Sequence, residues 1–553
     1  MKSIRVTQEM IDEYTAKGYW TDETLVGACE RNARLHPDRE AFVDHRRRLT
    51  WAQMEEEVNN LALNLLHLGI RRDEVVVSQI PNWNEAMELR LACEKAGILF
   101  AGAILPFRHT EMEHLLRATQ AVAVVVPSKF RDFDYLGMVR ELQPRVPALK
   151  HMIVGGGEAR NGTISLFDMC AAPPPGRDRA SLNGLTYSAT ETSAVGITSG
   201  TTGLPKCIEW STAPIILMLK TFARTADLGA NDVTLAITPV VTGLGYLTPL
   251  STALVGGKSI LQERFDAEAT LQLIERERVT FFLAVPSQLV MLLQHSNFSK
   301  YNLSSLKAIR VTGAPLPPDV AMEAEKRFGC VLVNLYGAAD GGGFTWVSTK
   351  DPPQVRYYTT GKKYEGIEIK LVDENDQPVP DGEVGEVCAR GAVCYPGPFK
   401  DPEGVIKTWG AMGKEGWFHT GDLGFWDEGG NLVLAGRRKD MIIRGGQNIY
   451  PAEIENLIMT HPKVLTAAVV GMPDPVMGEK ACAFVVLRNG QGFTFDEMVS
   501  FLKGKNIASF KLPERLEVVE KFPMSGDGLK VLKRELAKGL IDNSQGHSGQ
   551  GGD

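Results

Sequence analysis

Short apolar runs of strand length alternate with amphipathic helical segments over the first two-thirds of this chain. The apolar run 75–80 is followed by a helical segment at 83–96 and a second apolar run at 97–105. Strands that alternate with helices form parallel sheets covered on both faces. The further strand candidates are residues 121–126, 233–237, 258–261, 280–285, 308–312 and 331–336, and the further helices are residues 267–277 and 318–328.

Residues 51–68 illustrate the helical pattern. Thr50 is a suitable cap at the start of this helix, and Gly69 is a suitable end. Apolar residues recur at steps of three and four, which is one face of a helix: Trp51, Met54, Val58, Leu61, Leu65 and Leu68.

The pattern changes near residue 366. Short strands at 367–372, 385–389 and 432–435 lie between Gly/Asp/Pro turns and predict a small antiparallel or barrel-like unit. From residue 454 the order helix, two strands, helix, strand predicts a compact α+β unit. A chain of 553 residues is too long to form a single hydrophobic core, so it is expected to divide into domains.

We therefore predict an α/β protein. Its N-terminal core, residues 1–438, holds two α/β subdomains and a small barrel-like subdomain. A mobile α+β domain follows at 439–541, and residues 542–553 are expected to be disordered because they are rich in Gly, Ser and Gln.

Composition excludes several classes of protein. The net charge of −7 argues against nucleic-acid binding, which needs a basic surface. The run Arg46-Arg47-Arg48 is expected to be a solvated turn. The eight cysteines show no zinc spacing, and buried thiols in a cytoplasm are expected. The chain has no signal-peptide core and no apolar run of 18 residues, so no membrane span is expected.

The segment Thr198-Ser-Gly-Thr-Thr-Gly-Leu-Pro-Lys206 predicts a phosphate-binding loop. Glycines let backbone N–H groups approach an anion, and hydroxyls and a lysine add further donors. The segment lacks the Walker spacing, so it is a phosphate loop of another kind. The donors are Thr198, Ser199, Gly200, Thr201, Thr202, Gly203 and Lys206.

Four further segments carry polar residues at predicted strand ends or turns. In Asn334-Leu-Tyr-Gly-Ala-Ala-Asp340, Tyr336 suits stacking on a base and Asp340 suits Mg²⁺. Taken alone, a buried tyrosine and a surface aspartate explain this segment better. In Trp417-Phe-His-Thr-Gly-Asp422, Asp422 suits a ribose, with a plain Asp turn as the alternative, and His419 is expected to be structural.

The other two segments lie further along the chain. Arg437 opens a glycine-containing stretch that links the last two units, and it suits ribose or phosphate, although an interdomain linker is the alternative. In Phe522-Pro-Met-Ser-Gly-Asp-Gly-Leu-Lys530, the lysine follows a glycine-rich turn from which it can reach a neighbouring site. A solvent-facing lysine is the commoner case.

In their order and spacing, these five segments resemble the adenylate-forming superfamily, from residue 23 to residue 540. The resemblance implies ATP-dependent conversion of a carboxylate to acyl-AMP with release of pyrophosphate, followed by transfer to a thiol. It implies Mg²⁺ at Asp340, catalytic roles for Lys206, Asp340 and Lys530, and a hinge at Lys439. The remaining implied contacts are nucleotide and thiol contacts at Gly313, Ala314, Pro315, Tyr336, Gly337, Asp422, Arg437, Gly445 and Gly446, and a substrate pocket at Thr242, Gly243, Thr312, Gly313 and Gly341.

This sequence departs from the family pattern at four positions. Thr242 stands where the family often has His or an aromatic residue, Asp340 replaces the usual Glu, and Cys207 replaces a common Gly. Leu529 separates Gly528 from Lys530, and one inserted residue restores Lys530 to its role.

The run Tyr14-Thr-Ala-Lys-Gly-Tyr-Trp20 resembles aryl-acid activating members of the superfamily. Thr242-Gly243 takes the place of their His-Asn, which argues against selecting a 2-hydroxybenzoate. We therefore expect a ring acid without that hydroxyl, aromatic or alicyclic, with short fatty acids as an alternative. CoA is the expected acceptor, and a separate carrier protein is the alternative.

Three alternatives remain at this stage. The chain is an AMP-binding protein that has lost catalysis, a luciferase-type oxygenase, or the ligase outlined above, which we favour. Assembly into a homodimer is a further alternative.

Overall fold

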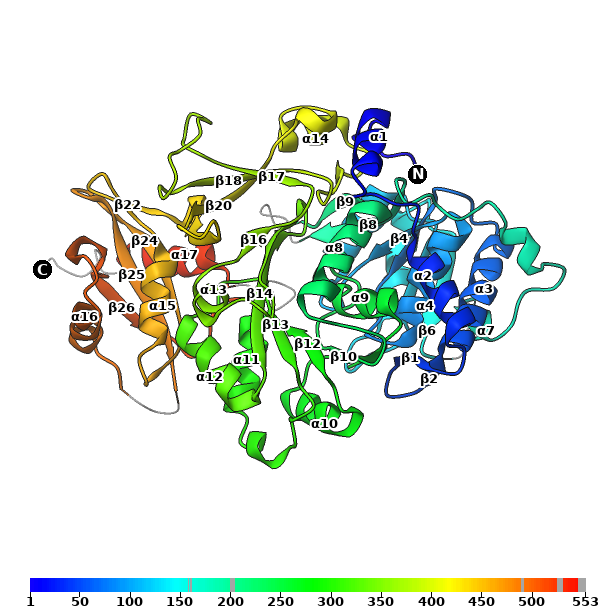
Figure 1. Ribbon diagram of the computed structural model, residues 1–553, viewed down its shortest axis with the longest axis horizontal. Helices are drawn as coiled ribbons and strands as arrows, with labels where there is room; N and C mark the ends of the chain where they lie inside the picture. The colour runs from blue at the N-terminus through cyan, green and yellow to red at the C-terminus, as the bar shows by residue number, and fades with distance from the viewer. Residues whose placement is uncertain (158, 160–161, 199–203, 489–491, 525–530, 546–553) are drawn as a thin grey trace, which may run out of the picture.

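The computed structural model describes residues 1–157, 159, 162–198, 204–488, 492–524 and 531–545. Four β-sheets form its framework, and helices cover them (Figure 1). Two large sheets occupy the centre and right of Figure 1, a strand-rich unit lies above them, and the C-terminal unit lies at the left. The predicted α/β class with a large N-terminal region and a small C-terminal domain is confirmed.

The first large sheet is parallel from β8 to β7, and the antiparallel strands β9 and β19 extend its other edge. Its order is β19 (Gly397–Pro398), β9 (Lys206–Ser211), β8 (Thr192–Thr198), β4 (Leu99–Gly102), β3 (Val75–Ser78), β5 (Ala123–Pro127), β6 (His151–Gly155) and β7 (Ile164–Ser165).

The second large sheet is parallel from β14 to β1 and antiparallel at both edges. Its order is β16 (Lys362–Lys363), β15 (Gly342–Trp346), β14 (Val331–Ala338), β13 (Ala308–Val311), β12 (Phe281–Ala284), β10 (Val233–Ala236), β11 (Lys258–Leu261), β1 (Glu40–Val43) and β2 (Arg48–Thr50).

Apolar runs form the inner strands because both of their faces are buried. On β3, Val76 packs into one core, whereas Val75 and Val77 pack into the core on the opposite face. Successive side chains of a strand point to opposite faces, so a strand covered on both sides must be apolar at every position. This is the physical reason why continuous apolar runs predicted these strands.

Helices connect the parallel strands. The predicted helix at 51–68 is α3 (Trp51–His67), where the Thr50 hydroxyl accepts from Gln53 N at 3.2 Å and Gly69 adopts φ 81°. The other helices before the strand-rich unit are α1 (Gln8–Ala16), α2 (Leu25–Leu35), α4 (Asn84–Ala96), α5 (His109–Thr119), α6 (Tyr135–Leu142), α7 (Leu166–Ala171), α8 (Thr212–Thr225), α9 (Leu247–Val255), α10 (Ala267–Glu277), α11 (Pro286–Gln294), α12 (Pro318–Phe328) and α13 (Pro353–Tyr358).

The strand-rich unit is an antiparallel four-stranded sheet accompanied by α14 (Pro402–Trp409). The C-terminal unit has its own apolar core, which includes Ile442, Ile454 and Val469. The strands of the two units are β17 (Ile367–Val372), β18 (Gly385–Gly391), β20 (Phe418–Trp426) and β21 (Leu432–Arg437), and then β22 (Ile442–Arg444), β23 (Gln447–Ile449), β24 (Val464–Asp474), β25 (Gly478–Leu487) and β26 (Arg515–Val518).

Three helices complete the C-terminal unit: α15 (Pro451–Met459), α16 (Phe495–Gly504) and α17 (Lys533–Gln545). The 3₁₀ helices of the chain are η1 (Gln143–Arg145), η2 (Arg179–Leu182), η3 (Phe298–Lys300), η4 (Gly413–Glu415), η5 (Arg438–Asp440) and η6 (Ser509–Lys511). The predicted boundary between residues 438 and 439 falls within η5.

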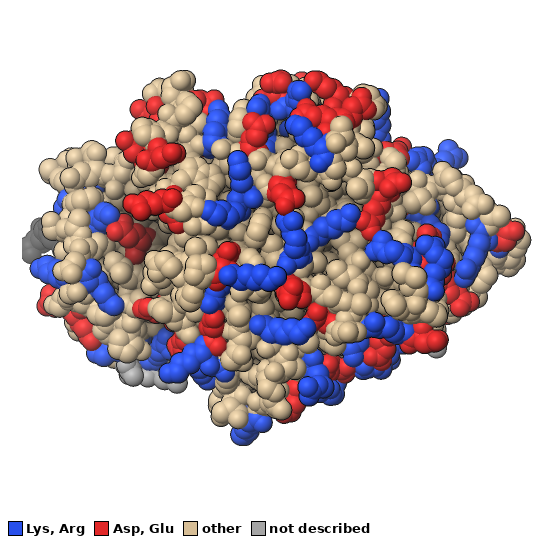
Figure 2. Space-filling view, viewed as in Figure 1, with Lys and Arg blue, Asp and Glu red and all other residues tan. Residues whose placement is uncertain are grey.

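Surface charge and membrane propensity agree with the composition. On the face shown in Figure 2, basic and acidic side chains are interspersed. Within the described residues, no helix is long and apolar enough to cross a membrane. All eight cysteines are free, and seven of them are buried.

The expectation of a solvated turn at Arg46-Arg47-Arg48 is only partly correct, because the run lies at the turn between β1 and β2 but the guanidinium groups of Arg46 and Arg47 bind buried carboxyl groups. The Arg46 guanidinium contacts the carboxylates of Asp44 and the fully buried Glu85. Arg47 Nη2 lies 2.8 Å from Glu88 Oε1 and 2.6 Å from Glu57 Oε2. Buried carboxyl groups need hydrogen-bond partners, so Arg46 and Arg47 turn inward toward Glu85 and Glu88 on helix α4.

Burial and the neighbouring Glu57 carboxylate raise the pKa of Glu88 well above its ordinary value of 4.5. The native state therefore retains a proton that the unfolded chain releases. This contribution to stability is complete below the unfolded pKa and is lost as the pH rises toward the folded pKa.

Glu88→Gln removes this loss because glutamine cannot ionise in either state. Each unit of upward pKa shift is worth about 1.4 kcal/mol. Wild type loses this stability as the pH rises from 4.5 to 8, whereas Glu88→Gln does not. We therefore expect the melting temperature of Glu88→Gln minus that of wild type to increase over this pH range. Thermal denaturation at several pH values measures this, with the exposed Glu374→Gln as the matched control. An unchanged difference across this range would show that Glu88 ionises normally.

Candidate active site

Three residues from separate segments meet at the end of β14. Asp422 on β20 and Arg437 on β21 are paired in register, and Arg437 Nε lies 2.8 Å from Asp422 Oδ1. Tyr336 on β14 donates its hydroxyl to Asp422 Oδ2 at 2.9 Å. The structure therefore brings together three residues that the sequence assigned to base and ribose contacts.

The Asp422 carboxylate is held in one orientation by these two contacts. Burial, followed by the Asp422 charge, raises the pKa of Tyr336 well above its ordinary value, so its hydroxyl stays protonated and donates. A carboxylate oriented in this way suits two neighbouring hydroxyl groups, such as those of a ribose, because its oxygens accept hydrogen bonds.

The predicted phosphate loop connects two antiparallel strands. Thr198 ends β8 and pairs with Lys206, the first residue of β9. Lys206 Nζ lies 3.7 Å from Asp340 Oδ2, and their side chains are 48% and 30% exposed. An exposed ion pair of this kind is worth little, so both groups are available to a ligand. The intervening Ser199, Gly200, Thr201, Thr202 and Gly203 lie outside the described residues, as does Lys530.

Asp340 is the residue to which the sequence assigned Mg²⁺. Within the described part of the chain, the groups of three potential metal ligands are Glu57–Glu88–Cys170 and Asp376–Cys388–His419, and neither includes Asp340. A single exposed carboxylate beside a phosphate loop still fits Mg²⁺, because this ion takes most of its ligands from water and substrate phosphates.

His419 and Cys388 form a second polar group on the strand-rich sheet. Cys388 Sγ lies 3.3 Å from His419 Nδ1. Burial raises the pKa of the Cys388 thiol to about 12, which leaves it neutral and a poor nucleophile. This fits the expectation that His419 is structural.

The glycines on either side of Asp340, Gly337 and Gly341, are required by packing. A Cβ on Gly341 would lie 2.5 Å from Phe418 Cε1 and 2.8 Å from Phe344 Cζ, and a Cβ on Gly337 would lie 2.5 Å from the Gly342 carbonyl. The turn between β14 and β15 can therefore lie against the aromatic side chains only with glycine here. Because Gly341 allows this packing, it helps to fix the backbone position of the neighbouring Asp340.

The predicted substrate-pocket residues line the loop before α9 and the end of β13. The Thr242 hydroxyl donates to the Pro239 carbonyl at 2.8 Å and accepts from Gly245 N at 3.1 Å, so it stabilises its own turn. Gly243 lies between Trp210 and Ala339. The buried Thr312 donates to the Leu335 carbonyl at 2.9 Å.

The residues after Thr312 form an exposed loop, which comprises Gly313, Ala314 and Pro315. Gly313 adopts φ 90°, and a Cβ there would lie 3.1 Å from Leu244 Cδ1. This loop therefore adjoins the turn that carries Thr242 and Gly243.

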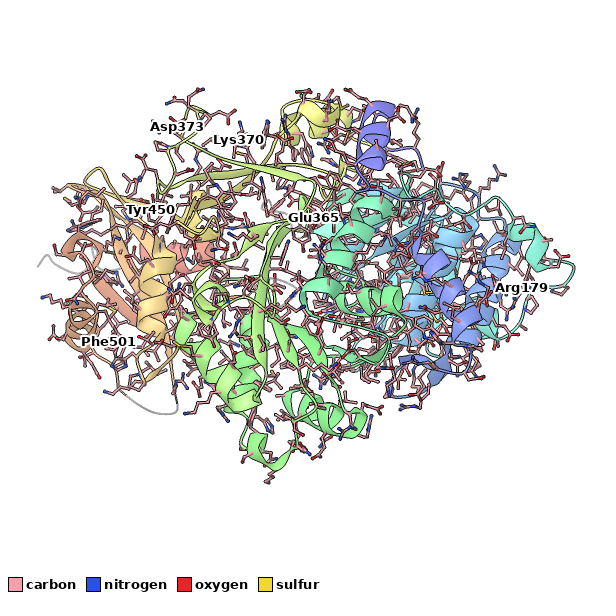
Figure 3. All side chains as sticks on the ribbon, in the orientation of Figure 1. Arg179, Glu365, Lys370, Asp373, Tyr450 and Phe501 are labelled. Atoms are coloured by element: carbon pink, nitrogen blue, oxygen red, sulfur yellow. The ribbon has the colours of Figure 1, made fainter. Side chains whose placement is uncertain are left out.

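The predicted hinge and thiol-contact residues, Lys439, Gly445 and Gly446, lie in or next to the C-terminal unit. Gly445 and Gly446 have φ values of 56° and 79° and form the two-residue turn between β22 and β23, a geometry that favours glycine. Tyr450, labelled in Figure 3, precedes α15, and its Cβ lies 4.0 Å from the Cβ position of Gly436 on β21. The C-terminal unit therefore touches β21 beside Arg437, and the exposed Lys439 lies in η5 between them.

Sequence reasoning missed Arg90 and Trp210, which lie beside this region. Arg90 and Glu94 are charged residues four positions apart on α4, a helix buried on all sides except at Lys95. The sequence signal that could have identified Arg90 is the presence of charged residues on a helix that lies between two apolar strands.

Family comparisons agree with this geometry. Residues 29–397 match the family model described as "AMP-binding enzyme", and residues 453–529 match "AMP-binding enzyme C-terminal domain". The chain therefore belongs to the AMP-binding enzyme family, which confirms the resemblance to adenylate-forming enzymes.

Individual relatives extend over nearly the whole chain. The 2-hydroxy-7-methoxy-5-methyl-1-naphthoate–CoA ligase of Streptomyces carzinostaticus is 32% identical over 95% of this chain and 94% of its own length. The medium-chain fatty-acid–CoA ligase of Escherichia coli is also 32% identical, over 96% of this chain and 92% of its own. Aryl-acid–AMP ligases are among the relatives as well.

The fold has a similarly extensive match among solved structures. The anthranilate CoA ligase AuaEII in complex with anthranoyl-AMP has a TM-score of 0.87 and 25% identity, and the match covers 95% of this chain and 98% of that chain.

Proposed function

We propose that this protein is an acid–thiol ligase that uses ATP to activate a ring-containing carboxylic acid, aromatic or alicyclic, and transfers the acyl group to CoA. The observation that carries the proposal is the convergence of Tyr336, Asp422 and Arg437 beside the Lys206–Asp340 pair. These residues are the candidate base, ribose and phosphate contacts of the proposed site. The free thiols of the chain support a reducing compartment such as the cytoplasm.

In the first step a carboxylate oxygen of the acid attacks the α-phosphorus of ATP, and pyrophosphate leaves. The nucleophile is already ionised, so the protein mainly aligns anions and offsets their charge. Tyr336 contacts the adenine, Asp422 and Arg437 hold the ribose, and Lys206 contacts the phosphates. Asp340 would hold Mg²⁺, and the ion would offset the charge of the phosphates.

In the second step the CoA sulfur attacks the acyl carbon, the bond to AMP breaks, and the thiol proton passes to solvent. We assign rotation of the C-terminal domain between the steps to Lys439, and the thiol passage to Gly445 and Gly446.

The test is ATP–pyrophosphate exchange with a panel of carboxylic acids, followed by AMP release on addition of CoA. The panel includes benzoates, cyclohexanecarboxylates and a medium-chain fatty acid, because one relative carries that name. Exchange with a ring acid and CoA-dependent AMP release are expected. Exchange without CoA-dependent release would favour a carrier-protein acceptor, and no exchange with any acid would exclude the ligase.

Lys439→Pro is expected to slow the second step selectively. Proline fixes φ near −65°, which a 3₁₀ turn tolerates but a rotation about this residue does not. We expect CoA-dependent AMP release to fall about tenfold or more, equivalent to roughly 1.4 kcal/mol in the barrier, while pyrophosphate exchange is retained. Lys439→Ala, which removes the side chain but leaves φ free, controls for the loss of the lysine itself. Equal rates in both assays would place the hinge elsewhere.

A further inference from the structure

An apolar pocket is lined by residues of helices α4, α8 and α9 and of strands β4 and β9, together with Val240 and Val241. Arg90 is the one charged residue among the described residues that line it. Aromatic and aliphatic side chains form most of its wall, among them Met87, Phe100, Trp210, Ile215, Tyr246 and Leu250.

Arg90 is 7% exposed, and its hydrogen bonding is incomplete. Its Nη2 donates to Ser193 Oγ at 3.2 Å, whereas its Nη1 has no hydrogen-bond acceptor. The nearest carboxylate oxygen, Glu94 Oε2, is 3.5 Å from Nη1. A guanidinium has five N–H donors, and leaving them unpaired in a buried site costs free energy unless a ligand supplies an acceptor.

The pocket adjoins the proposed acid site through a shared wall. Val240 and Val241 line the pocket and directly precede Thr242 and Gly243. Trp210 also lines it, and Trp210 Cζ2 lies 3.5 Å from the Cβ position of Gly243. A Cβ on Gly243 would also lie 3.7 Å from Ala339 Cβ, so Gly243 lies between the Trp210 wall of the pocket and Ala339.

We infer that this pocket receives the end of the acid substrate that is far from the reacting carboxylate, and that Arg90 binds an uncharged oxygen acceptor carried there, such as a ketone. The substrate class is then a ring acid with a distal oxygen acceptor on an otherwise apolar body. This inference rests on the proposed function.

The choice of an uncharged acceptor follows from the charges around Arg90. Glu94 is fully buried and already faces the guanidinium. Its oxygens accept from Val26 N at 3.1 Å and from the Thr212 hydroxyl at 3.4 Å. A second carboxylate would place two acids against one cation in an apolar site, which the cost of charge burial disfavours.

Matched acids test the inference in the exchange assay. 4-Acetylbenzoate and 4-acetylphenylacetate are compared with their 4-isopropyl analogues, which have nearly the same shape but no acceptor. A hydrogen bond to a charged donor predicts that wild type prefers the acetyl member of a pair by about tenfold or more in kcat/KM. Terephthalate, with a second carboxylate, is expected to be a poor substrate.

Variants then assign the preference to Arg90. Arg90→Met is expected to lower the acetyl/isopropyl ratio to about one, and Arg90→Lys to retain part of it. A merely structural role would depress both acids equally and leave the ratio unchanged. Glu94→Gln keeps a polar group beside Arg90 and is expected to admit terephthalate. If Arg90→Met does not fold, the acetyl/isopropyl ratio of Arg90→Lys is compared with that of wild type, and a lower ratio in Arg90→Lys supports the inference.

The failures of the two proposals are distinguishable. No acetyl preference in wild type, an unchanged ratio in the Arg90 variants, or good use of terephthalate by wild type overturns the inference. The same holds if neither pair is activated while another carboxylic acid is. In each of these cases the proposed function stands, and it fails only if no carboxylic acid supports exchange.

Discussion

Replacing Asp422 by alanine is expected to lower kcat/KM for ATP strongly. Asp422 is the acceptor that Arg437 and Tyr336 orient, at 2.8 Å and 2.9 Å. A hydrogen bond to a charged group is worth about 1.5–3 kcal/mol, so losing two from a ribose corresponds to a decrease of roughly 10²–10⁴-fold. Pyrophosphate exchange at varied ATP and saturating acid measures this.

Two comparisons make the result specific to the carboxylate. Asp422→Asn keeps an acceptor for Tyr336 and is expected to lose less than alanine. Glu428→Ala, in the exposed turn between β20 and β21, removes a carboxylate from the same hairpin and is the matched control. An Asp422→Ala enzyme that uses ATP as well as this control would remove Asp422 from the ribose site.

Replacing Lys530 by alanine is expected to cut acyl-AMP formation by about 10²–10³-fold, because a cation at the transferring phosphoryl group stabilises the charge that develops there. The family resemblance assigns this residue to the first step alone. Thioester formation from supplied acyl-AMP should therefore be retained.

Lys533→Ala is the matched control, because Lys533 Nζ is engaged 2.6 Å from Glu455 within the C-terminal unit. Equal loss of both steps in Lys530→Ala would contradict the assignment. So would a loss of the first step in Lys533→Ala alone.

The local elements of this fold were predictable because their physical causes are local. The ranges 258–261, 267–277 and 318–328 match β11, α10 and α12. The continuous apolar run of β11 and the apolar periodicity of the two helices reflect burial at each position. Longer runs such as 97–105 overestimated the strand, because β4 spans only Leu99–Gly102 and its flanking apolar residues are buried in turns.

Contacts between distant segments were not predictable from such patterns. Strand β1 pairs with its sequence neighbour β2 on one side and with the distant strand β11 on the other. Arg46 and Arg47 turn inward because helix α4 buries Glu85 and Glu88, which a local reading of a basic run cannot show.

The candidate site divides in the same way. The glycines and hydroxyls of residues 198–206 marked a phosphate loop by composition alone, but they did not show that Lys206 returns as an antiparallel strand toward Asp340. Tyr336, Asp422 and Arg437 were assigned through the family resemblance. Their mutual hydrogen bonds, and the incomplete ones of Arg90, needed coordinates.

A crystal structure of the protein with a non-hydrolysable ATP analogue tests the central claim most directly. The account predicts the adenine against Tyr336, the ribose hydroxyls within hydrogen-bond distance of Asp422, and the phosphates beside Lys206. A nucleotide bound elsewhere, or a ribose out of reach of Asp422, would contradict it.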